Sequence, residues 1–331
     1  MLKINHPIYG LATIHEPALI ALIKSPAMQR LKHIEQHGTW QFHRDYRAKN
    51  RFTRYQHSIG VMLLLRKFNA SLAEQIHGLL HDISHTAFSH VSDFVFESDP
   101  MKHDYQDSKT EKAYELQGVN KILKAHGLKP NYILNEKNFP LAERDLPDLC
   151  ADRIDYTLQD PWGWELYRTD RKKILADLVV YKKQFVFKTR RAAKQFAELN
   201  FQLNKQVWCN PLQVAIYDIS AQAIRQALDS QVITKKDLYQ TDAFVANKLR
   251  RAANPLVRQN FKRLKNLKIE SVKSKQQADL CRSSKPRVVD PSFLENNRLV
   301  KLTSVDKAYK TKTAKWQAGV KRGFYIKILN S

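Results

Sequence analysis

The sequence predicts a mostly α protein, with a helical body over residues 1–250 and a small basic α+β region over 251–331. Glycine and proline number only 9 and 12 in 331 residues, which disfavours a loop-rich, fibrous or all-β chain. Apolar residues recur at helical spacing through much of the body. From about residue 266, short β-branched and aromatic runs are separated by polar turns, as in strands.

The body begins with helical spacing over residues 15–36, broken near Ser25-Pro26, where a second helix can begin. Residues 38–56 interleave aromatic and basic side chains, which predicts an ordered loop or short hairpin. We expect the further helices of the body at 56–68, 71–82, 84–97, 111–126, 145–160, 190–230 and 234–252.

Local signals support some of these limits. Ser71 followed by Glu74 is a capping box at the start of a helix, and Pro147 suits the first turn of the helix at 145–160. In the C-terminal region we expect strands in the runs KIESVK (268–273), RVVDPSF (287–293), RLVKLTSV (298–305) and GFYIKIL (323–329).

Charge is distributed unevenly along the chain. The 56 Lys and Arg against 32 Asp and Glu give a net charge of +24. Residues 1–160 carry 20 basic and 19 acidic side chains, whereas residues 161–331 carry 36 and 13. An excess of this size predicts contact with a polyanion, such as nucleic acid, a nucleotide or an anionic surface, or else a solvated cationic face.

Several classes of protein are disfavoured by the sequence. No window of about 18 apolar residues exists, so no membrane-spanning helix is expected. The first residues lack the apolar segment of a secretory signal. Cys150, Cys209 and Cys281 are far apart, which supports neither a disulfide framework nor a CxxC zinc site. We therefore expect a cytoplasmic protein.

A series of histidines and aspartates indicates a metal site. His57 is followed by the pair His81-Asp82 and later by Asp152. Adjacent residues on a helix lie about 100° apart, so His81 and Asp82 can both approach one ion between helices. Mixed nitrogen and oxygen ligands suit a divalent metal such as Mn, Fe, Mg, Zn or Ni, among which the sequence does not choose.

Three spaced motifs carry a resemblance to a known family. They are RYQHSIGV (54–61), HGLLHDISHTAFSH (77–90) and ADRIDYTLQD (151–160). Together they resemble the HD-domain phosphohydrolases, and most closely the deoxynucleoside triphosphate triphosphohydrolase (dNTPase) branch, which includes bacterial dNTPases and the mammalian SAM-and-HD-domain enzyme. The resemblance covers most of residues 1–250, with the metal motifs within 54–160, and implies an HD-domain helical bundle.

The resemblance also implies roles for individual residues. His57, His81, Asp82 and Asp152 match the metal ligands. The implied catalytic residues are His85 and His90, which line the phosphate path, and His103 and Asp104, which match a supporting His-Glu pair. The implied substrate contacts are Arg54 and Arg153 for phosphate, Gln36 and His37 for the sugar, and Tyr156 and Asp160 around its 3′ side.

The sequence departs from the family pattern at several positions. Ser84 replaces the usual Gly after His-Asp-Ile. In the helix that helps the dNTPases hold the γ-phosphate and the base, the family's basic and Tyr/His positions are occupied by Asn200, Asn204, Trp208 and Asn210. These changes affect positions that would bind the triphosphate and the base, and they leave the metal motifs intact. The basic loop 43–54 is a candidate source of replacement cations, or a feature that admits a longer polyanion.

The leading functional hypothesis is a metal-dependent dNTPase that releases deoxynucleoside and triphosphate by attack of metal-activated water on the α-phosphorus. The second is an HD-type nuclease or phosphodiesterase acting on nucleic-acid ends, or on a different phosphoester. The third is a nucleic-acid-binding module without turnover. The expected partners are a nucleotide substrate, nucleic acid at the basic C-terminal half, and further copies of the chain in a homo-oligomer, with no membrane.

Overall fold

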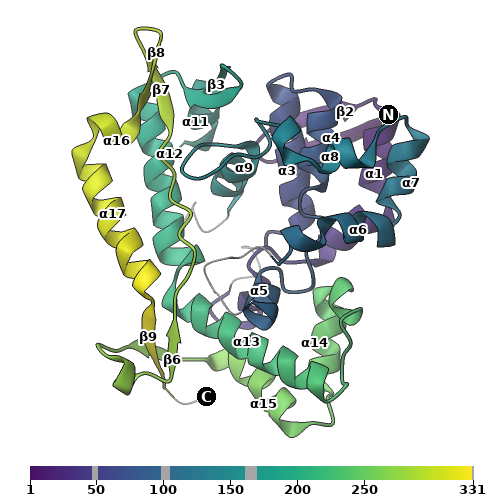
Figure 1. The fold of residues 1–331 in the computed structure, drawn as a ribbon, viewed down its shortest axis with the longest axis vertical. Coiled ribbons are helices and arrows are strands. Elements are labelled where there is room, and N and C mark those ends of the chain that lie inside the picture. Colours follow the sequence, from purple (N-terminus) through teal and green to yellow (C-terminus); the bar gives the residue numbers. More distant parts are fainter. Residues whose placement is uncertain (47–50, 98–104, 161–169, 330–331) are drawn as a thin grey trace.

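The structure is a computed structural model and describes residues 1–46, 51–97, 105–160 and 170–329. Helices make up most of it and small sheets lie at its periphery, which confirms the mostly α prediction (Figure 1). Within these four ranges, no helix combines the length and the apolar character needed to cross a membrane.

Three helices form the frame of the metal motifs: α3 (Arg54–Lys67), α4 (Leu72–Leu80) and α9 (Ala151–Gln159). The start of α3 is fixed by a capping box, in which the Thr53 side chain accepts from the Gln56 N–H and the Gln56 side chain accepts from the Thr53 N–H. Ser71 caps α4 by accepting from the Glu74 N–H, as predicted, but the Glu74 side chain accepts from the Leu141 and Ala142 N–H groups, so the predicted capping box is only half formed.

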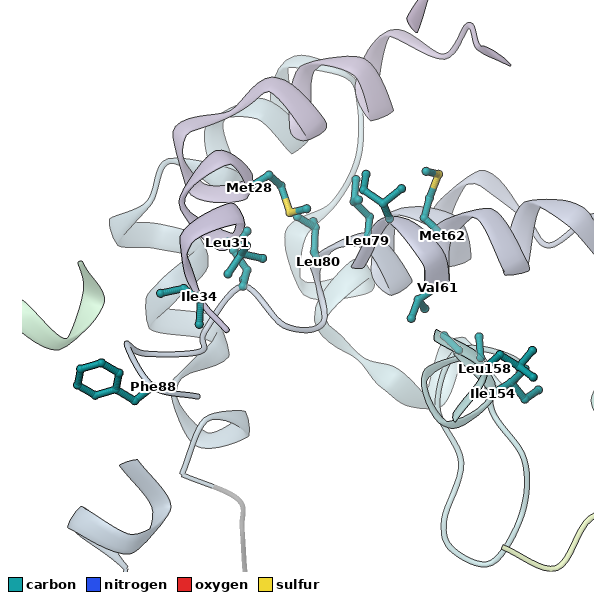
Figure 2. Close-up of a cluster of buried hydrophobic side chains, with 14 of the residues drawn as sticks. Met28, Leu31, Ile34, Val61, Met62, Leu79, Leu80, Phe88, Ile154 and Leu158 are labelled. Carbon is teal, nitrogen blue, oxygen red and sulfur yellow. The ribbon is translucent and has the colours of Figure 1, made fainter. Parts of the chain in front are cut away.

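Close helix packing depends on two glycines. A Cβ atom on Gly60 of α3 would lie 2.1 Å from Asp155 Oδ1 of α9, and one on Gly78 of α4 would lie 2.5 Å from Leu65 Cδ1 of α3. The three helices share a buried apolar cluster, shown in Figure 2 with Val61, Met62, Leu79, Leu80, Ile154 and Leu158 among its members. This packing holds the backbone that carries the metal motifs in fixed positions.

Shorter helices surround this frame. In the first half they are α1 (Pro17–Lys24), α2 (Pro26–Arg30), α5 (Val91–Phe96), α6 (Thr110–Leu116), α7 (Val119–Ala125) and α8 (Pro130–Leu134), with single 3-10 turns η1 (Leu31–His33), η2 (Gly38–Phe42), η4 (Asp107–Lys109) and η5 (Glu136–Asn138). The break at Ser25, which caps α2, confirms the predicted division between the first two helices.

The second half contains both long and short helices. They are α11 (Arg171–Asp177), α12 (Arg190–Leu203), α13 (Pro211–Asp229), α14 (Asp242–Arg250), α15 (Pro255–Arg263), α16 (Leu302–Val305) and α17 (Lys307–Arg322), with a π-helical turn η6 (Asn204–Trp208) and 3-10 turns η7 (Asp237–Tyr239), η8 (Leu264–Asn266) and η9 (Lys275–Gln277). The long α17 lies beside α12 at the edge of the molecule (Figure 1).

The strands form three small sheets among the described residues. The sheets are the hairpin β1 (Leu2–His6) and β2 (Gly10–Ile14), the sheet β3 (Leu178–Tyr181), β4 (Gln184–Phe187), β7 (Ser292–Glu295) and β8 (Arg298–Lys301), and the sheet β5 (Ile269–Ser271), β9 (Phe324–Ile328) and β6 (Leu280–Arg282). Strand β7 pairs with β4 in parallel, so residues beyond 250 complete a sheet begun before them. The domain boundary after residue 250 stays a prediction.

Two predicted helices next to the motifs are wrong at their N-terminal ends. The helix expected over 84–97 is confined to α5, because Phe88 and Ser89 have positive φ angles of 65° and 52° and turn the chain out of helical geometry. Tertiary contacts stabilise this turn: Phe88 N–H donates to Asp242 Oδ1 at 2.7 Å, and Ser89 Oγ donates to the Glu35 carbonyl at 2.6 Å. The helix expected over 145–160 begins at Ala151, so Pro147 precedes it.

Other helix limits also differ from the predictions. The helix expected over 111–126 is split at Gly118, whose φ of 74° ends one helix before the next begins. The helix expected over 190–230 is interrupted by the π-helical turn and by Pro211, and the one expected over 234–252 begins at Asp242. Three of the four predicted C-terminal strand runs contain β5, β8 and β9, and the run 287–293 overlaps β7 only at its last two residues, whereas β1, β2 and β6 were not predicted.

Candidate metal centre

A cavity of about 580 Å3 opens beside the ends of α3, α4 and α9. Most of the predicted site residues line it: Gln36, His37, Arg54, His81, Asp82, His85, His90, Asp152, Tyr156 and Asp160. His57 lies directly behind this wall, fully buried. Arg153 is not among the described residues that line the cavity, and His103 and Asp104 fall outside the described ranges.

Four of the predicted metal ligands come together from three helical segments. The ligand atoms of His57, His81 and Asp152 all lie within 4.8 Å of one another. Asp152 Oδ1 is 2.8 Å from His57 Nε2 and 3.5 Å from His81 Nε2. Asp82 is also close, with Oδ1 3.5 Å from His81 Nε2 and Oδ2 3.9 Å from His57 Nε2.

The Nδ1 hydrogen bonds of the two histidines leave their Nε2 atoms facing each other and Asp152. His57 Nδ1 lies 2.7 Å from Asp155 Oδ2, and His81 Nδ1 lies 2.8 Å from the Gly78 carbonyl oxygen. Because carboxylate and carbonyl oxygens accept, both Nδ1 atoms carry the hydrogen, and each ring presents a lone pair on Nε2 once that atom has lost its proton. These two Nε2 atoms are 3.1 Å apart, and Asp152 Oδ1 lies 2.8 Å from that of His57, so the three atoms can share a proton or a metal ion. The donor set therefore fits a divalent metal.

Electrostatics also favours a positive charge at this point. Burial opposes protonation of His57, but Asp152 and Asp155 outweigh it and raise its pKa to about 10. His81 is affected in the same way: burial opposes its charge, while Asp82 and Asp152 raise its pKa to about 9. A metal ion supplies the positive charge that these neighbours stabilise.

The sequence analysis assigned no role to Asp155, which orients His57. Its buried carboxylate accepts from His57 Nδ1, from Tyr9 Oη at 2.7 Å and from Gln159 Nε2 at 2.8 and 2.9 Å. Asp155 follows Asp152 by three positions on α9 and so lies on the same helix face. That spacing is the sequence signal from which its position beside the metal ligands could have been predicted.

Arg54 is held beside the metal ligands. Its Nη1 donates to Asp82 Oδ2 at 2.9 Å and its Nε to Ser89 Oγ at 3.0 Å, while the buried Nη2 has no hydrogen-bond partner among the described residues. Of the other basic loop residues, Arg51 lies 3.4 Å from Glu35 and does not line the described part of the cavity. Arg153 Nη1 donates to the Asp148 carbonyl at 3.1 Å, next to the start of α9.

The next two predicted residues, His85 and His90, form a pair of perpendicular rings whose centroids are 5.0 Å apart. His85 Nε2 lies 3.0 Å from Asp82 Oδ1, and its buried Nδ1 has no hydrogen-bond partner in the described structure. His90 Nδ1 lies 2.9 Å from Asp93 Oδ2. Burial lowers the pKa of His85 to about 4, with Arg54 adding to the effect, and also lowers the pKa of His90.

A second wall of the cavity is aromatic and polar. Trp208 Nε1 donates to Asp160 Oδ2 at 2.9 Å, and the same oxygen lies 3.4 Å from His37 Nε2. The Tyr156 ring packs edge-on against Trp208 with centroids 4.9 Å apart. Tyr156 Oη and Gln36 Oε1 are buried without hydrogen-bond partners among the described residues, which leaves them available to a ligand.

Comparisons with known proteins agree with this reading of the site. A family model described as "HD domain" matches residues 54–159. An uncharacterized Bacillus subtilis protein, YdhJ, is 35% identical over 99% of both chains. A metal-dependent phosphohydrolase of Cordyceps militaris, cns2, is 32% identical over 87% of this chain and 84% of its own.

More distant proteins match as well. The deoxynucleoside triphosphate triphosphohydrolase SAMHD1 of Danio rerio is 32% identical over 38% of this chain, which covers 23% of that protein. Among solved structures, a phosphohydrolase from Bacteroides thetaiotaomicron superposes with a TM-score of 0.70 at 16% identity, covering 98% of this chain and 99% of that one. This last likeness confirms the fold.

Proposed function

The chain belongs to the HD-domain family of metal-dependent phosphohydrolases, and we propose that it cleaves a deoxynucleoside triphosphate to the deoxynucleoside and triphosphate. At the coarser level the protein is a hydrolase of phosphoester bonds that uses a divalent metal. The choice of substrate is supported by the SAMHD1 relatives and by the shape and lining of the cavity.

One observation carries the proposal: buried polar atoms without partners among the described residues surround the metal donor set on the cavity wall. They include Arg54 Nη2 on the phosphate side, and Tyr156 Oη and Gln36 Oε1 on the aromatic side. Buried polar atoms are normally paired, so this arrangement predicts a polar ligand with an anionic end. A volume of about 580 Å3 lies in the range of small-molecule sites and suits a single nucleotide.

His57, His81, Asp82 and Asp152 would hold a divalent cation, which would supply Lewis-acid activation of water and of a phosphoryl oxygen. Arg54, oriented by Asp82 and Ser89, donates from Nη2 to the phosphate and stabilises its developing charge.

His85 and His90 line the cavity on the side of Arg54 and are the candidate proton donors. The free Nδ1 of His85 can take a proton when an anion enters the cavity, because a neighbouring negative charge favours the imidazolium form. His85 is then placed to protonate the leaving oxygen, with His90 as the alternative donor.

The test is a substrate panel. The metal-loaded protein is incubated with dNTPs, NTPs, mononucleotides and single-stranded oligonucleotides, and the products are separated by ion-pair chromatography. We expect tripolyphosphate and deoxynucleoside from dNTPs. Asp152→Ala should abolish this release, whereas Asp145→Ala, at an exposed position outside the cavity lining, should retain it. Hydrolysis of oligonucleotides without tripolyphosphate release would refute the proposal.

A different phosphoester is the second candidate. The Cordyceps relative matches more than twice the share of this chain that SAMHD1 matches, and its name specifies a metal-dependent phosphohydrolase without a triphosphate. Orthophosphate release from a mononucleotide in the same panel, with dNTPs left intact, identifies this candidate. Cleavage of nucleic-acid ends, nucleic-acid binding without turnover, homo-oligomerisation and a cytoplasmic location stay predictions.

A further inference from the structure

Cations from the C-terminal part of the chain also line the cavity. Besides Arg54, the described lining residues include Lys137, Lys285 and Arg287. Lys285 and Arg287 belong to the extended segment 283–291 that joins β6 to β7 and runs along α12 (Figure 1). We propose that Arg287, presented by this segment, forms a second phosphate subsite that binds the distal phosphates of a polyphosphate substrate. The inference rests on the proposed function for the identity of the substrate.

The segment is fixed to the helical body by main-chain hydrogen bonds. The Arg287 N–H donates to Asn204 Oδ1 at 2.7 Å, the Tyr309 hydroxyl donates to the Val289 carbonyl at 2.9 Å, and the Asp290 N–H donates to the Pro147 carbonyl at 2.9 Å. These anchors lie in different parts of the chain. Arg287 is therefore presented by a backbone that is held in place before any ligand binds.

Burial alternates along the segment as in a strand. Pro286 and Val288 are buried, whereas Lys285 and Arg287 are half-buried and line the cavity. Val288 packs in a buried apolar cluster with Phe201 and Tyr309, whereas Lys285 and Arg287 line the cavity. Arg287 takes part in no ion pair with a described residue, so its charge is available to an anion.

Electrostatic effects show that the Arg287 guanidinium acts inside the cavity. Burial is the main cause of the lowered pKa of His90, and the charge of Arg287 contributes to it. Burial raises the pKa of Tyr156 and of Tyr217, and the charge of Arg287 opposes that shift at both. These three side chains line the cavity from separate elements, and Arg287 lines it with them, so its charge acts on groups around the cavity.

A buried polar chain connects this subsite to the helix that carries Asp152. Asn204 Nδ2 lies 3.1 Å from Asn200 Oδ1, and Asn200 Nδ2 lies 3.1 Å from Thr157 Oγ1 on α9. Both asparagines are fully buried. Asn200 and Asn204 are among the four positions where the family has basic or Tyr/His residues, and Asn204, supported by Asn200, holds the segment that carries Arg287. Asn204 is therefore a positioning residue for Arg287.

Arg54 and Arg287 can bind different phosphate groups of one polyphosphate. Arg54 contacts the metal ligand Asp82 and is placed for the phosphate that reacts, whereas Arg287 comes from the C-terminal segment. Arginine binds phosphate oxygens in a bidentate manner, which suits it to an unreacting phosphate that must be held in place. A single phosphate bound at the metal does not need this second site, so the subsite favours polyphosphates.

The test measures binding of inorganic tripolyphosphate and orthophosphate to the metal-loaded, full-length protein by calorimetry, with the metal content checked afterwards. The variants are Arg287→Ala, Arg287→Lys and Arg298→Ala, the last removing a charge from an exposed position in the same region. We expect Arg287→Ala to weaken tripolyphosphate binding about tenfold to a hundredfold, Arg287→Lys to weaken it less, and Arg298→Ala to leave it unchanged. Orthophosphate binding should change little in all three.

The subsite would be overturned if Arg287→Ala weakened the binding of tripolyphosphate and of orthophosphate equally, or if it left tripolyphosphate binding unchanged. The same variants are assayed for hydrolysis of a dNTP, where the subsite predicts a raised KM with a smaller effect on kcat. Failure of the wild-type protein to release tripolyphosphate refutes the dNTPase proposal alone, because the binding preference is measured without turnover. The two proposals can therefore fail separately.

Discussion

Replacing Asp155 with asparagine should weaken metal binding although no metal ligand is changed. In the structure the Asp155 carboxylate accepts hydrogen bonds from His57 Nδ1, Tyr9 Oη and Gln159 Nε2, all at 2.7 to 2.9 Å. An asparagine has one oxygen and one NH2 group in place of two oxygens. Three donors then compete for one acceptor, and the NH2 group must face at least one of them.

The magnitude follows from the effect on His57. When the NH2 group faces Nδ1, the ring keeps its proton on Nε2, the atom that lies 2.8 Å from Asp152 Oδ1 and points to the metal position. Loss of such an outer hydrogen bond typically costs about 10–100-fold in metal affinity, which corresponds to roughly 1.4–2.7 kcal/mol. We expect a loss in this range.

The assay is competition for Mn2+ or Zn2+ with a chromogenic chelator at neutral pH. Asp145→Asn makes the same chemical change at an exposed position and should bind metal as the wild type does. Circular dichroism and thermal melting establish that both variants are folded. A folded Asp155→Asn protein with unchanged metal affinity would refute the role assigned to the Asp155 hydrogen bonds.

Two further predictions concern the same frame and its stability. Gly60→Ala places a Cβ 2.1 Å from Asp155 Oδ1. We expect this substitution to lower the free energy of unfolding in urea by about 1–3 kcal/mol and to weaken metal binding as well. A Gly60→Ala variant as stable as the wild type would contradict the packing described. His77 is buried, and its Nδ1 lies 2.7 Å from the Ile133 carbonyl. Burial lowers the pKa of His77 to about 4, whereas the same group in the unfolded chain titrates near 6.5. The unfolded chain therefore binds the extra proton first, and the free energy of unfolding falls as the pH is lowered from 6.5 towards 4. His77→Gln should therefore make the urea midpoint less sensitive to pH in that window, and an identical pH dependence in both proteins would show that His77 does not titrate there.

The metal centre could be anticipated because its residues are fixed by local patterns. His57, His81-Asp82 and Asp152 stand in order on segments with strong helical spacing, and the structure brings their side chains together. The turn at Phe88 and Ser89 was not predicted, because non-glycine residues adopt positive φ there under tertiary contacts with Asp242 and Glu35. Those contacts span up to 154 positions in the sequence and leave no local signal.

The wall opposite the metal shows a second limit of sequence patterns. Asn200 and Asn204 stand among positions where the family has basic or Tyr/His residues, and the sequence alone gives no sign that Asn204 anchors a segment more than 80 positions later. Arg153 matches the family motif at a phosphate contact; its Nη1 donates to the Asp148 carbonyl, and its contact with phosphate stays a prediction. Long-range packing decides which basic side chains face the cavity, and no periodicity in the sequence encodes it.

The parallel pairing of β4 with β7 has a consequence for the order of events during synthesis. All the described metal ligands have left the ribosome when residue 152 emerges, but the strand that completes the sheet, Ser292–Glu295, follows about 140 residues later. At typical elongation rates of about 5–20 residues per second, this interval lasts roughly 7–28 seconds. The metal ligands thus leave the ribosome many seconds before the strand that completes this sheet, and the C-terminal wall of the cavity is the last part of the site to be synthesised.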